Sequence, residues 1–222
     1  KTLEEQESLF REAMAWRLDH AQSWGTTTTN GSFGAEFEKY RKGKGNAPDW
    51  WTFLEQTQPQ VLYGADRDGL PILYTAPGQA DLAGCQREVG YDALERYAVM
   101  ENDVFLDLAR EATRERSSSF GRHQVLHSGY VIVNLEGLSW RHFGEAKVFN
   151  KMAAAAKILH PERQRRCFVV RAPPAFAAVW RLIKPIVDPR TAARITILGA
   201  TESLQPLLDE LGAGSVPDFL GG

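Results

Sequence analysis

Cysteine is scarce in this sequence, and long apolar runs are absent from it. Only Cys85 and Cys167 occur in 222 residues, which is typical of reduced thiols in an intracellular compartment and excludes a disulfide scaffold. No apolar run reaches 18 residues, so we expect no transmembrane helix. The first ten residues, KTLEEQESLF, are charged where a signal peptide would be apolar. The sequence therefore predicts a soluble, cytoplasmic protein.

A large excess of charge of either sign is also missing. Lys and Arg number 26 against 28 Asp and Glu, a net charge of −2, and no basic block is dense enough to predict nucleic-acid binding. The basic run ERQRR at 162–166 is typical of a solvated helix end, and a patch for an anionic membrane surface is the alternative. A hydrophobic content of 43% and a charged content of 24% predict a globular chain with a large core.

Apolar periodicity alternates along the chain between helical and strand-like segments. Helices are expected at FEKYRK, at DWWTFLEQ, and over residues 3–20, 91–114, 145–159 and 175–187. Strands are expected at residues 72–74, 129–135, 167–173 and 194–198. A stretch rich in Gly and Thr, residues 25–34, predicts a loop. This alternation predicts an α/β fold with a mostly parallel sheet.

Glu101 falls inside the apolar stripe of the helix expected over 91–114. A charged residue in such a position is usually at the edge of the buried face, with its carboxylate reaching water. We therefore expect an edge residue, and keep a buried carboxylate paired with a base as the alternative.

Catalytic templates fit the sequence poorly. LHSGY at 126–130 holds Ser128 but lacks the spacing and the following helix of a hydrolase nucleophile elbow. His123 and His127 lie four residues apart, but with no third ligand near in sequence a zinc site is disfavoured. GKGNAPD lacks the Lys-Ser/Thr ending of a phosphate loop. No catalytic group or metal site is predicted, so we do not expect an enzyme.

One segment of forty residues carries a more specific pattern. Residues 160–199, HPERQRRCFVVRAPPAFAAVWRLIKPIVDPRTAARITILG, resemble the signature of the CRAL-TRIO lipid-binding family, in its phosphatidylinositol/phosphatidylcholine transfer branch. That signature runs YPER, a strand ending in NAP, an apolar helix, KPFLDPxT, a basic residue and a strand. The resemblance extends to AMAWRLD, DRDGLPILY, VNLEGLS and VPDFLGG, in the family's order across nearly the whole chain.

The resemblance implies parallel strands that form the floor of a lipid pocket, covered by a mobile gate helix at residues 175–187. The apolar residues of this segment fall at i, i+3, i+4, i+7 and i+11, namely Phe176, Val179, Trp180, Ile183 and Val187. Such a stripe taken alone is core more often than lid. Pro185 lacks a hydrogen-bond donor and would break or kink the helix, so we expect a hinge there.

The resemblance also implies a headgroup site. In the family, a threonine and a lysine hold the phosphate of phosphatidylinositol, and Thr191 and Arg194 stand at the matching positions. Arg194 keeps the charge and adds bidentate capacity. Glu162 matches the PER glutamate, and Asp66 matches an acidic position of the inositol site. From residue types alone, helix capping is the simpler role for Thr191, and pairing with a neighbouring arginine is the simpler role for Glu162.

Two departures from the family pattern bear on the ligand. In the transfer branch, a Ser and a Thr two residues apart hold the phosphate of the choline lipid, and Gly129 and Val131 occupy those positions here. Ser128 and Tyr130 are one residue out of phase, which in a strand means the opposite face. Phosphatidylinositol is therefore the first expected ligand, ahead of phosphatidylcholine.

The expected domain organisation has three parts. Residues 1–24 are the end of an N-terminal helical piece, residues 25–60 are a loop with short helices, and residues 61–222 are the CRAL-TRIO lipid-binding domain. The preceding helices of the family have no counterpart in the sequence, so we expect a fragment of a longer protein with additional domains.

The sequence thus predicts a protein without catalysis and without a cofactor other than its lipid. It would bind one phospholipid and transfer it between membranes or present it to a lipid-modifying enzyme, with peripheral and transient contact at the membrane surface. One alternative is a carrier of a tocopherol, a retinoid or a sterol-like molecule. Another is an interaction module that regulates GTPases or traffic without transferring lipid.

Overall fold

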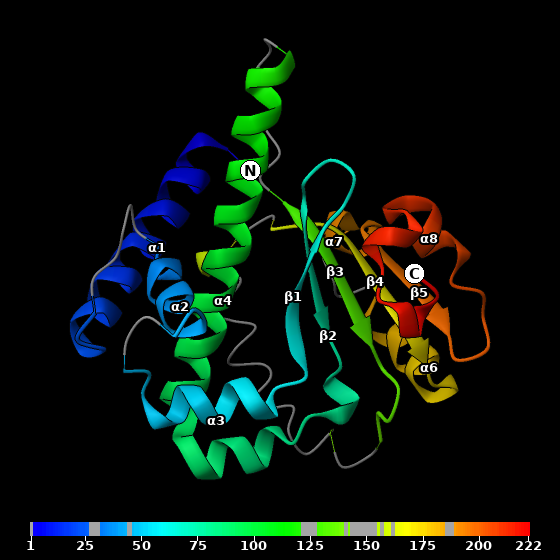
Figure 1. Cartoon of the computed structure of the whole chain (residues 1–222), viewed down its shortest axis with the longest axis horizontal. Coiled ribbons are helices and arrows are strands. Elements are labelled where there is room, and N and C mark those ends of the chain that lie inside the picture. The colour runs from blue at the N-terminus through cyan, green and yellow to red at the C-terminus, as the bar shows by residue number, and fades with distance from the viewer. Residues whose placement is uncertain are drawn as a thin grey trace. The chain divides into compact units, whose positions relative to one another are not determined.

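The structure is a computed structural model, shown as a ribbon in Figure 1. It describes residues 2–26, 32–43, 46–120, 128–139, 142, 155, 158–160, 163–184 and 189–222, apart from the side chains of residues 119, 120, 177–179, 182 and 183. The chain divides into two compact units. The first unit comprises Lys1–Thr57, Leu82–Val104 and Glu145–Pro161, and the second comprises Gln58–Asp81, Phe105–Gly144 and Glu162–Gly222.

The described elements of the first unit are helices. They are α1 (Leu3–Ser23), α2 (Gly34–Arg41), α3 (Asp49–Thr57) and the first part of α4 (Leu82–Phe120). A capping box begins α1, in which the Thr2 side chain accepts from the Glu5 N–H and the Glu5 carboxylate accepts from the Thr2 N–H. Gly90 has φ 80° and ψ 167°, a conformation that interrupts α4 and that glycine adopts without steric cost.

The second unit is built on a five-stranded sheet, in which the strands lie in the order β1-β2-β3-β4-β5. The strands are β1 (Gln60–Ala65), β2 (Pro71–Thr75), β3 (Gly129–Asn134), β4 (Gln164–Ala172) and β5 (Ile195–Gly199). Only the pair β1–β2 is antiparallel, and β2 to β5 run parallel. The expected α/β fold with a mostly parallel sheet is confirmed.

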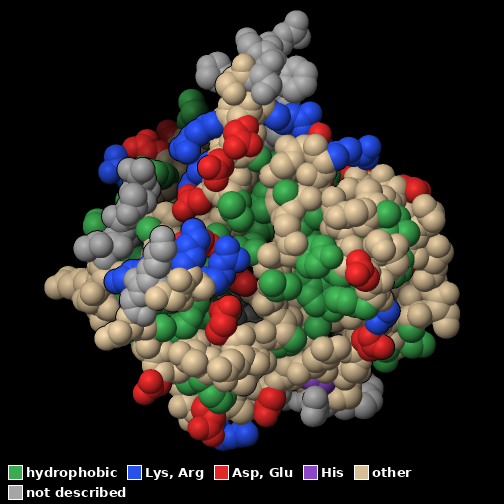
Figure 2. All heavy atoms as spheres, viewed as in Figure 1, with side chains coloured by type: hydrophobic (Ala, Val, Ile, Leu, Met, Phe, Trp, Pro, Cys, Tyr) green, Lys and Arg blue, Asp and Glu red, His purple; other side chains and the backbone are tan. Residues whose placement is uncertain are grey.

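Helices and short turns fill the connections of the sheet. The helices are α6 (Pro174–Ile183), α7 (Pro189–Ala193) and α8 (Gln205–Leu211), and the 3-10 turns are η1 (Pro77–Gln79), η3 (Ala213–Ser215) and η4 (Asp218–Leu220). On the face of the molecule drawn in Figure 2, hydrophobic side chains gather over the strands of the sheet.

The two faces of the sheet are covered to different degrees. On one face, Ile72, Ile132, Phe168 and other sheet side chains are buried together with residues of α8 and the C-terminal segment. On the other face, Val131 and Cys167 are buried, but several neighbouring aliphatic sheet side chains are only partly buried. The first face is therefore closed by protein, and the second is covered less completely.

Several expected elements are confirmed and a few were wrong or missed. The helices expected near 3–20, at FEKYRK and at DWWTFLEQ are present as α1, α2 and α3, and the four expected strands are present as β2, β3, β4 and β5. The strand at 72–74 is the second of the sheet rather than the first, because β1 precedes it and was not predicted. The sequence analysis also missed α8 and the part of α4 before Gly90. Most of the helix expected over 145–159 lies outside the described residues.

Candidate functional site

The less covered face of the sheet forms a surface of aliphatic side chains from four parallel strands. We call it the apolar floor, and its residues are Leu73, Val131, Val133, Cys167, Val169, Ile195 and Ile197. Side chains alternate between the faces of a strand, so these residues share one face while Tyr130, Phe168 and Leu198 lie on the other. Val133 is only partly buried although β3 is the central strand, so the floor retains accessible apolar surface at mid-sheet.

Cys167 supplies the only heteroatom among the side chains of the floor. Burial raises the pKa of its thiol to about 11, although the charge of Arg163 acts in the opposite direction. The thiol therefore stays neutral at physiological pH and behaves as a small apolar group. The floor offers no charge and no strong hydrogen-bonding side chain, so it suits hydrocarbon.

The start of β3 is covered by an aromatic ring where the resemblance places a hydroxyl. A Cβ atom built on Gly129 would collide with the Pro71 carbonyl oxygen and with the Phe105 ring, whose Cζ atom would be 2.5 Å away. Two residues on, Val131 is buried in the floor. Neither position of the family's choline-lipid phosphate site therefore carries a hydroxyl group in this chain.

Helix α6 lies on the floor side of the sheet. Phe176, at its third position, packs against the floor residues and is partly buried, and Trp180 is half-buried. The side chains of Val179 and Ile183 lie outside the described residues, as do Pro185 and Val187. Two of the five expected apolar positions are thus placed, and the gate and its hinge stay predictions.

Thr191 and Arg194 lie together at the start of β5. Thr191 is exposed on α7, and its carbonyl oxygen accepts a hydrogen bond from the Arg194 N–H at 3.1 Å. The half-buried Arg194 side chain donates from Nη1 to the Gln164 carbonyl oxygen at 3.1 Å. The backbones of these two residues are therefore joined at the end of the sheet where β5 begins, and their role in binding a phosphate stays a prediction.

Asp66 lies elsewhere along the same end of the sheet. Its Oδ1 atom accepts from the backbone N–H groups of Asp68 and Leu70, both at 2.8 Å, and so closes the β1–β2 turn. Because β2 and β5 are three strand spacings apart, roughly 14 Å separates Asp66 from Arg194 across the sheet. The structure does not bring these two predicted headgroup residues together, and Glu162 lies outside the described residues.

A polar network on the closed face was not predicted. Glu210 of α8 accepts hydrogen bonds from Arg166 at 2.8 Å and from the Tyr130 hydroxyl at 3.2 Å. Burial raises the pKa of Tyr130, and Glu210 and Asp66 add to that rise against the opposing charge of Arg165. The network fastens α8 to β3 and β4. No spacing in the sequence links positions 130, 166 and 210, so it could not have been found there.

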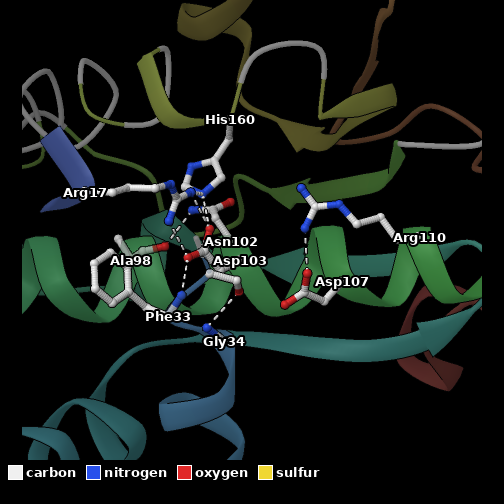
Figure 3. Close-up of polar contacts among 10 residues, drawn as sticks. Arg17, Phe33, Gly34, Ala98, Asn102, Asp103, Asp107, Arg110 and His160 are labelled. Atoms are coloured by element: carbon white, nitrogen blue, oxygen red, sulfur yellow. Dashed lines mark hydrogen bonds and ion pairs between the residues drawn. The ribbon is translucent and has the colours of Figure 1, made fainter. Parts of the chain in front are cut away.

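A second unpredicted cluster is buried in the first unit. The Asp103 carboxylate receives two hydrogen bonds of 2.7 Å from the Arg17 guanidinium, one from His160 Nε2 at 2.7 Å and one from the Phe33 N–H at 2.7 Å. Figure 3 shows these side chains converging from separate segments, and the more exposed pair Asp107–Arg110 further along α4. We call Arg17, Asp103 and His160 the buried triad.

The electrostatics of the buried triad favour a charged aspartate. Burial acts to raise the pKa of Asp103, but the hydrogen bonds and charges of His160 and Arg17 outweigh it and hold that pKa below its ordinary value. The position of His160 corresponds to the tyrosine of the family's YPER segment, so in this chain the triad is completed by the residue that departs from the pattern.

Glu101 is also buried, contrary to the edge position that was expected. Glu101 is only 1% exposed, so the expectation that its carboxylate reaches water was wrong. Burial raises the pKa of the neighbouring Tyr97, with the charges of Glu101 and Glu55 as further causes. The interior of this unit therefore tolerates two carboxylates on one helix.

Within the described ranges, no helix is both long and apolar enough to span a membrane, and no cluster of three potential metal ligands occurs. His123 and His127, considered for zinc, lie outside those ranges.

Comparison with known proteins gives the family. The sequence profile of the CRAL/TRIO domain matches residues 55–222, about three quarters of the chain. The chain belongs to the CRAL/TRIO domain family. The match begins within α3 and includes the whole sheet, so the apolar floor and the Thr191–Arg194 pair both lie inside this CRAL/TRIO domain.

Three curated relatives of this CRAL/TRIO chain illustrate the range of similarity. The CRAL-TRIO domain-containing protein T23G5.2 of Caenorhabditis elegans is 29% identical over 175 residues, 77% of this chain and 24% of the relative. The phosphatidylinositol/phosphatidylcholine transfer protein SFH7 of Arabidopsis thaliana is 24% identical over 222 residues, 99% of this chain and 36% of the relative. Protein real-time of Drosophila melanogaster is 30% identical over 172 residues, 74% of this chain and 25% of the relative.

The chain thus spans between about a quarter and about a third of the length of these three relatives. Among solved structures, the crystal structure of Sfh5 aligns with 72% of this chain and 52% of its own chain, at a TM-score of 0.45 and 19% identity.

Proposed function

We propose that this chain binds one phospholipid with its acyl chains over the apolar floor. The floor is the observation that carries the proposal, because a sheet face left partly uncovered in water is costly unless something apolar covers it. Phe176 places α6 on the same side, so a lipid chain bound there would lie between the floor and α6.

The proposed lipid is phosphatidylinositol. Its phosphodiester needs positive charge and hydrogen-bond donors, because an unpaired anion beside apolar surface is unfavourable. Thr191 and Arg194 offer both at the start of β5, next to Ile195 of the floor. Gly129 and the floor residue Val131 carry no hydroxyl, which disfavours phosphatidylcholine held in the manner of the transfer branch.

The proposed activity is transfer of this lipid between membranes, or its presentation to a lipid-modifying enzyme, without chemistry performed by the chain. The names of the Arabidopsis relatives SFH7 and SFH12 as phosphatidylinositol/phosphatidylcholine transfer proteins support this proposal. No cofactor is proposed beyond the lipid itself, and contact with membranes would be peripheral.

Two neighbouring residues of β5 allow a matched test. Ile197 and Thr196 are both partly buried, but Ile197 belongs to the floor and Thr196 lies on the opposite face. Ile197→Asn places an amide against the acyl chains, so transfer of fluorescent phosphatidylinositol between vesicles should fall about 10-fold or more, since an uncompensated polar group costs roughly 1–3 kcal/mol. Thr196→Asn should transfer at nearly the wild-type rate.

Circular dichroism melts of both variants establish that the domain remains folded. Equal transfer by folded Ile197→Asn and wild type would show that the lipid does not lie on the floor, and no transfer by the wild type would reject the proposed activity.

A further inference from the structure

The apolar floor is covered unevenly along its strands. Backbone pairing across β2 to β5 arranges its side chains, together with Thr75 of β2, in two rows. The first row is Leu73, Val131, Cys167 and Ile195, and the second row, nearer the strand ends, is Thr75, Val133, Val169 and Ile197. The first row is buried from β2 to β4, whereas the second row is only partly buried except at Val169. The surface open to a ligand is therefore the second row, joined at β5 by Ile195.

An aromatic ring of α4 lies beside the buried first row. Phe105 is 0% exposed and belongs to the same buried cluster as Leu73, Val131 and Cys167. A Cβ atom built on Gly129 would lie 3.0 Å from Cε2 of Phe105 and closer still to Cζ, so the ring rests on the β3 backbone with no side chain between them. Phe105 therefore fills the floor side of the sheet where β3 begins.

Two further contacts fix this part of α4 on the second unit. A Cβ atom built on Gly69, in the β1–β2 turn, would lie 3.4 Å from Cβ of the buried Ala112. Arg116 forms an ion pair with Asp68 of the same turn. These contacts lie about two and about three helical turns after Phe105. The helix that carries the ring is thus anchored to the sheet, and the ring is held in place.

We propose that Phe105 limits the length of the acyl chain that the apolar floor accepts. The inference rests on the proposed function and deepens it by naming a property of the lipid that the site selects. A chain that enters beside Ile195 can spread along the second row, which spans three strand spacings, roughly 14 Å. It has no other row to fold back on, because the first row is buried and the Phe105 ring fills the space at the start of β3.

Burial of hydrocarbon gives this selection a measurable slope. Each methylene group that moves from water to an apolar surface strengthens binding about four-fold. Methylene groups beyond the open part of the floor stay in water and add nothing. Affinity should therefore rise with chain length until the open surface is filled, and then become constant.

Two phenylalanines on opposite faces of the sheet allow a matched test. Phe105→Leu removes an aromatic ring on the floor side, and Phe168→Leu removes one on the closed face, where Phe168 is equally buried. Both leave a void in a buried cluster and so destabilise the fold for the same reason. Val131→Ala is a second, smaller opening of the first row. Each protein is incubated with a mixture of phosphatidylinositols of increasing acyl chain length, and native mass spectrometry measures the occupancy of each lipid.

In the wild type, occupancy should rise with chain length and then level off. In Phe105→Leu and Val131→Ala the rise should continue to longer chains, by about four-fold in relative affinity for each further methylene group that is buried. Phe168→Leu should keep the wild-type limit. A wild-type limit in both floor-side variants, an equal shift in Phe168→Leu, or a wild type without a limit would overturn the proposal. If Phe105→Leu does not fold, the limit in Val131→Ala decides.

The same measurement separates this inference from the proposed function. If all the proteins hold phosphatidylinositol with one common length limit, the lipid site stands and the role of Phe105 is wrong. If the wild type holds no phosphatidylinositol of any chain length, the proposed lipid site itself is wrong.

Discussion

At the scale of single residues, the buried triad joins segments that are far apart in the sequence. Arg17 comes from α1, Asp103 from α4, and His160 from the residues that precede β4 in the sequence. Each of the three is at least nine-tenths buried. A buried charge is tolerated only when its partners are held in place, so removal of one partner leaves the others unpaired at a high free-energy cost.

We therefore expect Asp103→Asn to lower the free energy of unfolding by about 3–5 kcal/mol near pH 7. Asp107→Asn is the matched control on the same helix, because Asp107 pairs with Arg110 while both side chains remain about half exposed, and such pairs contribute about 0–1 kcal/mol. Denaturant unfolding of the two variants measures the difference. Comparable losses of unfolding free energy in the two variants would show that the buried triad stabilises the fold no more than an exposed ion pair does.

The pH dependence of this difference has a definite sign. The pKa of Asp103 is lowered in the folded state, so its charged form adds stability above its ordinary pKa of 3.8, and that stability is lost as the pH falls towards the folded value. The gap between wild type and Asp103→Asn should therefore narrow below about pH 4. A gap that is constant from pH 7 to pH 3 would contradict an ionised Asp103.

The headgroup pair gives a second residue-scale prediction. Thr191→Val combined with Arg194→Ala removes a hydroxyl and a guanidinium, and loss of charge-assisted hydrogen bonds costs about 1.5–3 kcal/mol each. Transfer of phosphatidylinositol should be abolished while the domain stays folded in circular dichroism. Unchanged phosphatidylinositol transfer would reject the site, and an equal loss for every lipid would indicate damage to the fold, because Arg194 also bonds the Gln164 carbonyl.

The burial and the partners of single residues were the features least predictable from the sequence. Glu101 was expected at the edge of a stripe because carboxylates are rarely buried, yet the partners that permit burial come from other segments and leave no local pattern. The same holds for the triad, whose members are 86 and 57 residues apart. The turn that Asp66 closes between β1 and β2 was not predicted either, and the headgroup role that the resemblance implies for Asp66 stays a prediction.

At the scale of elements, α6 decides between two interpretations of one apolar stripe. The floor residues beneath it are partly buried, and Trp180 on the helix is half-buried. As a gate, α6 would leave the floor at the membrane and insert its apolar side into the bilayer. As core, it would stay in place and stabilise the sheet.

Trp180→Asp distinguishes these roles. If α6 is a gate, the variant should keep its fold, because Trp180 retains contact with solvent, and should lose vesicle binding and lipid exchange, since a carboxylate at the membrane interface is unfavourable. If α6 is core, the melting temperature should fall sharply. Melts and vesicle exchange on one preparation decide the matter, and a stable variant with normal exchange refutes the gate.

Elements with strong local signals were predictable, and those with weak signals were not. The continuous β-branched runs of β3, β4 and β5 identified them directly. Strand β1, QVLYGA, is an edge strand with a bulge between Leu62 and Gly64, so its alternation is interrupted. Helix α8 has only seven residues, too few for two full periods of an apolar stripe.

At the scale of the whole molecule, the parallel order of β2 to β5 gives the sheet two faces with different roles. The face under α8 is closed by buried side chains and by the Glu210 network. The opposite face presents the apolar floor, and Thr191 and Arg194 lie just before β5 at one end of the sheet. The mostly parallel fold could be predicted from alternating patterns, but the unequal covering of its faces could not, because it depends on which helices fold back on each side.

Native mass spectrometry of the protein, purified without detergent, tests the central claim most directly. If one phospholipid is bound over the apolar floor, we expect a population heavier than the bare chain by the mass of a single lipid. Fragmentation after extraction should identify that lipid as phosphatidylinositol. That mass should disappear in Ile197→Asn and persist in Thr196→Asn. A bound tocopherol, retinoid or sterol mass would contradict phosphatidylinositol as the ligand, and a bare chain after incubation with lipid vesicles would contradict the lipid site itself.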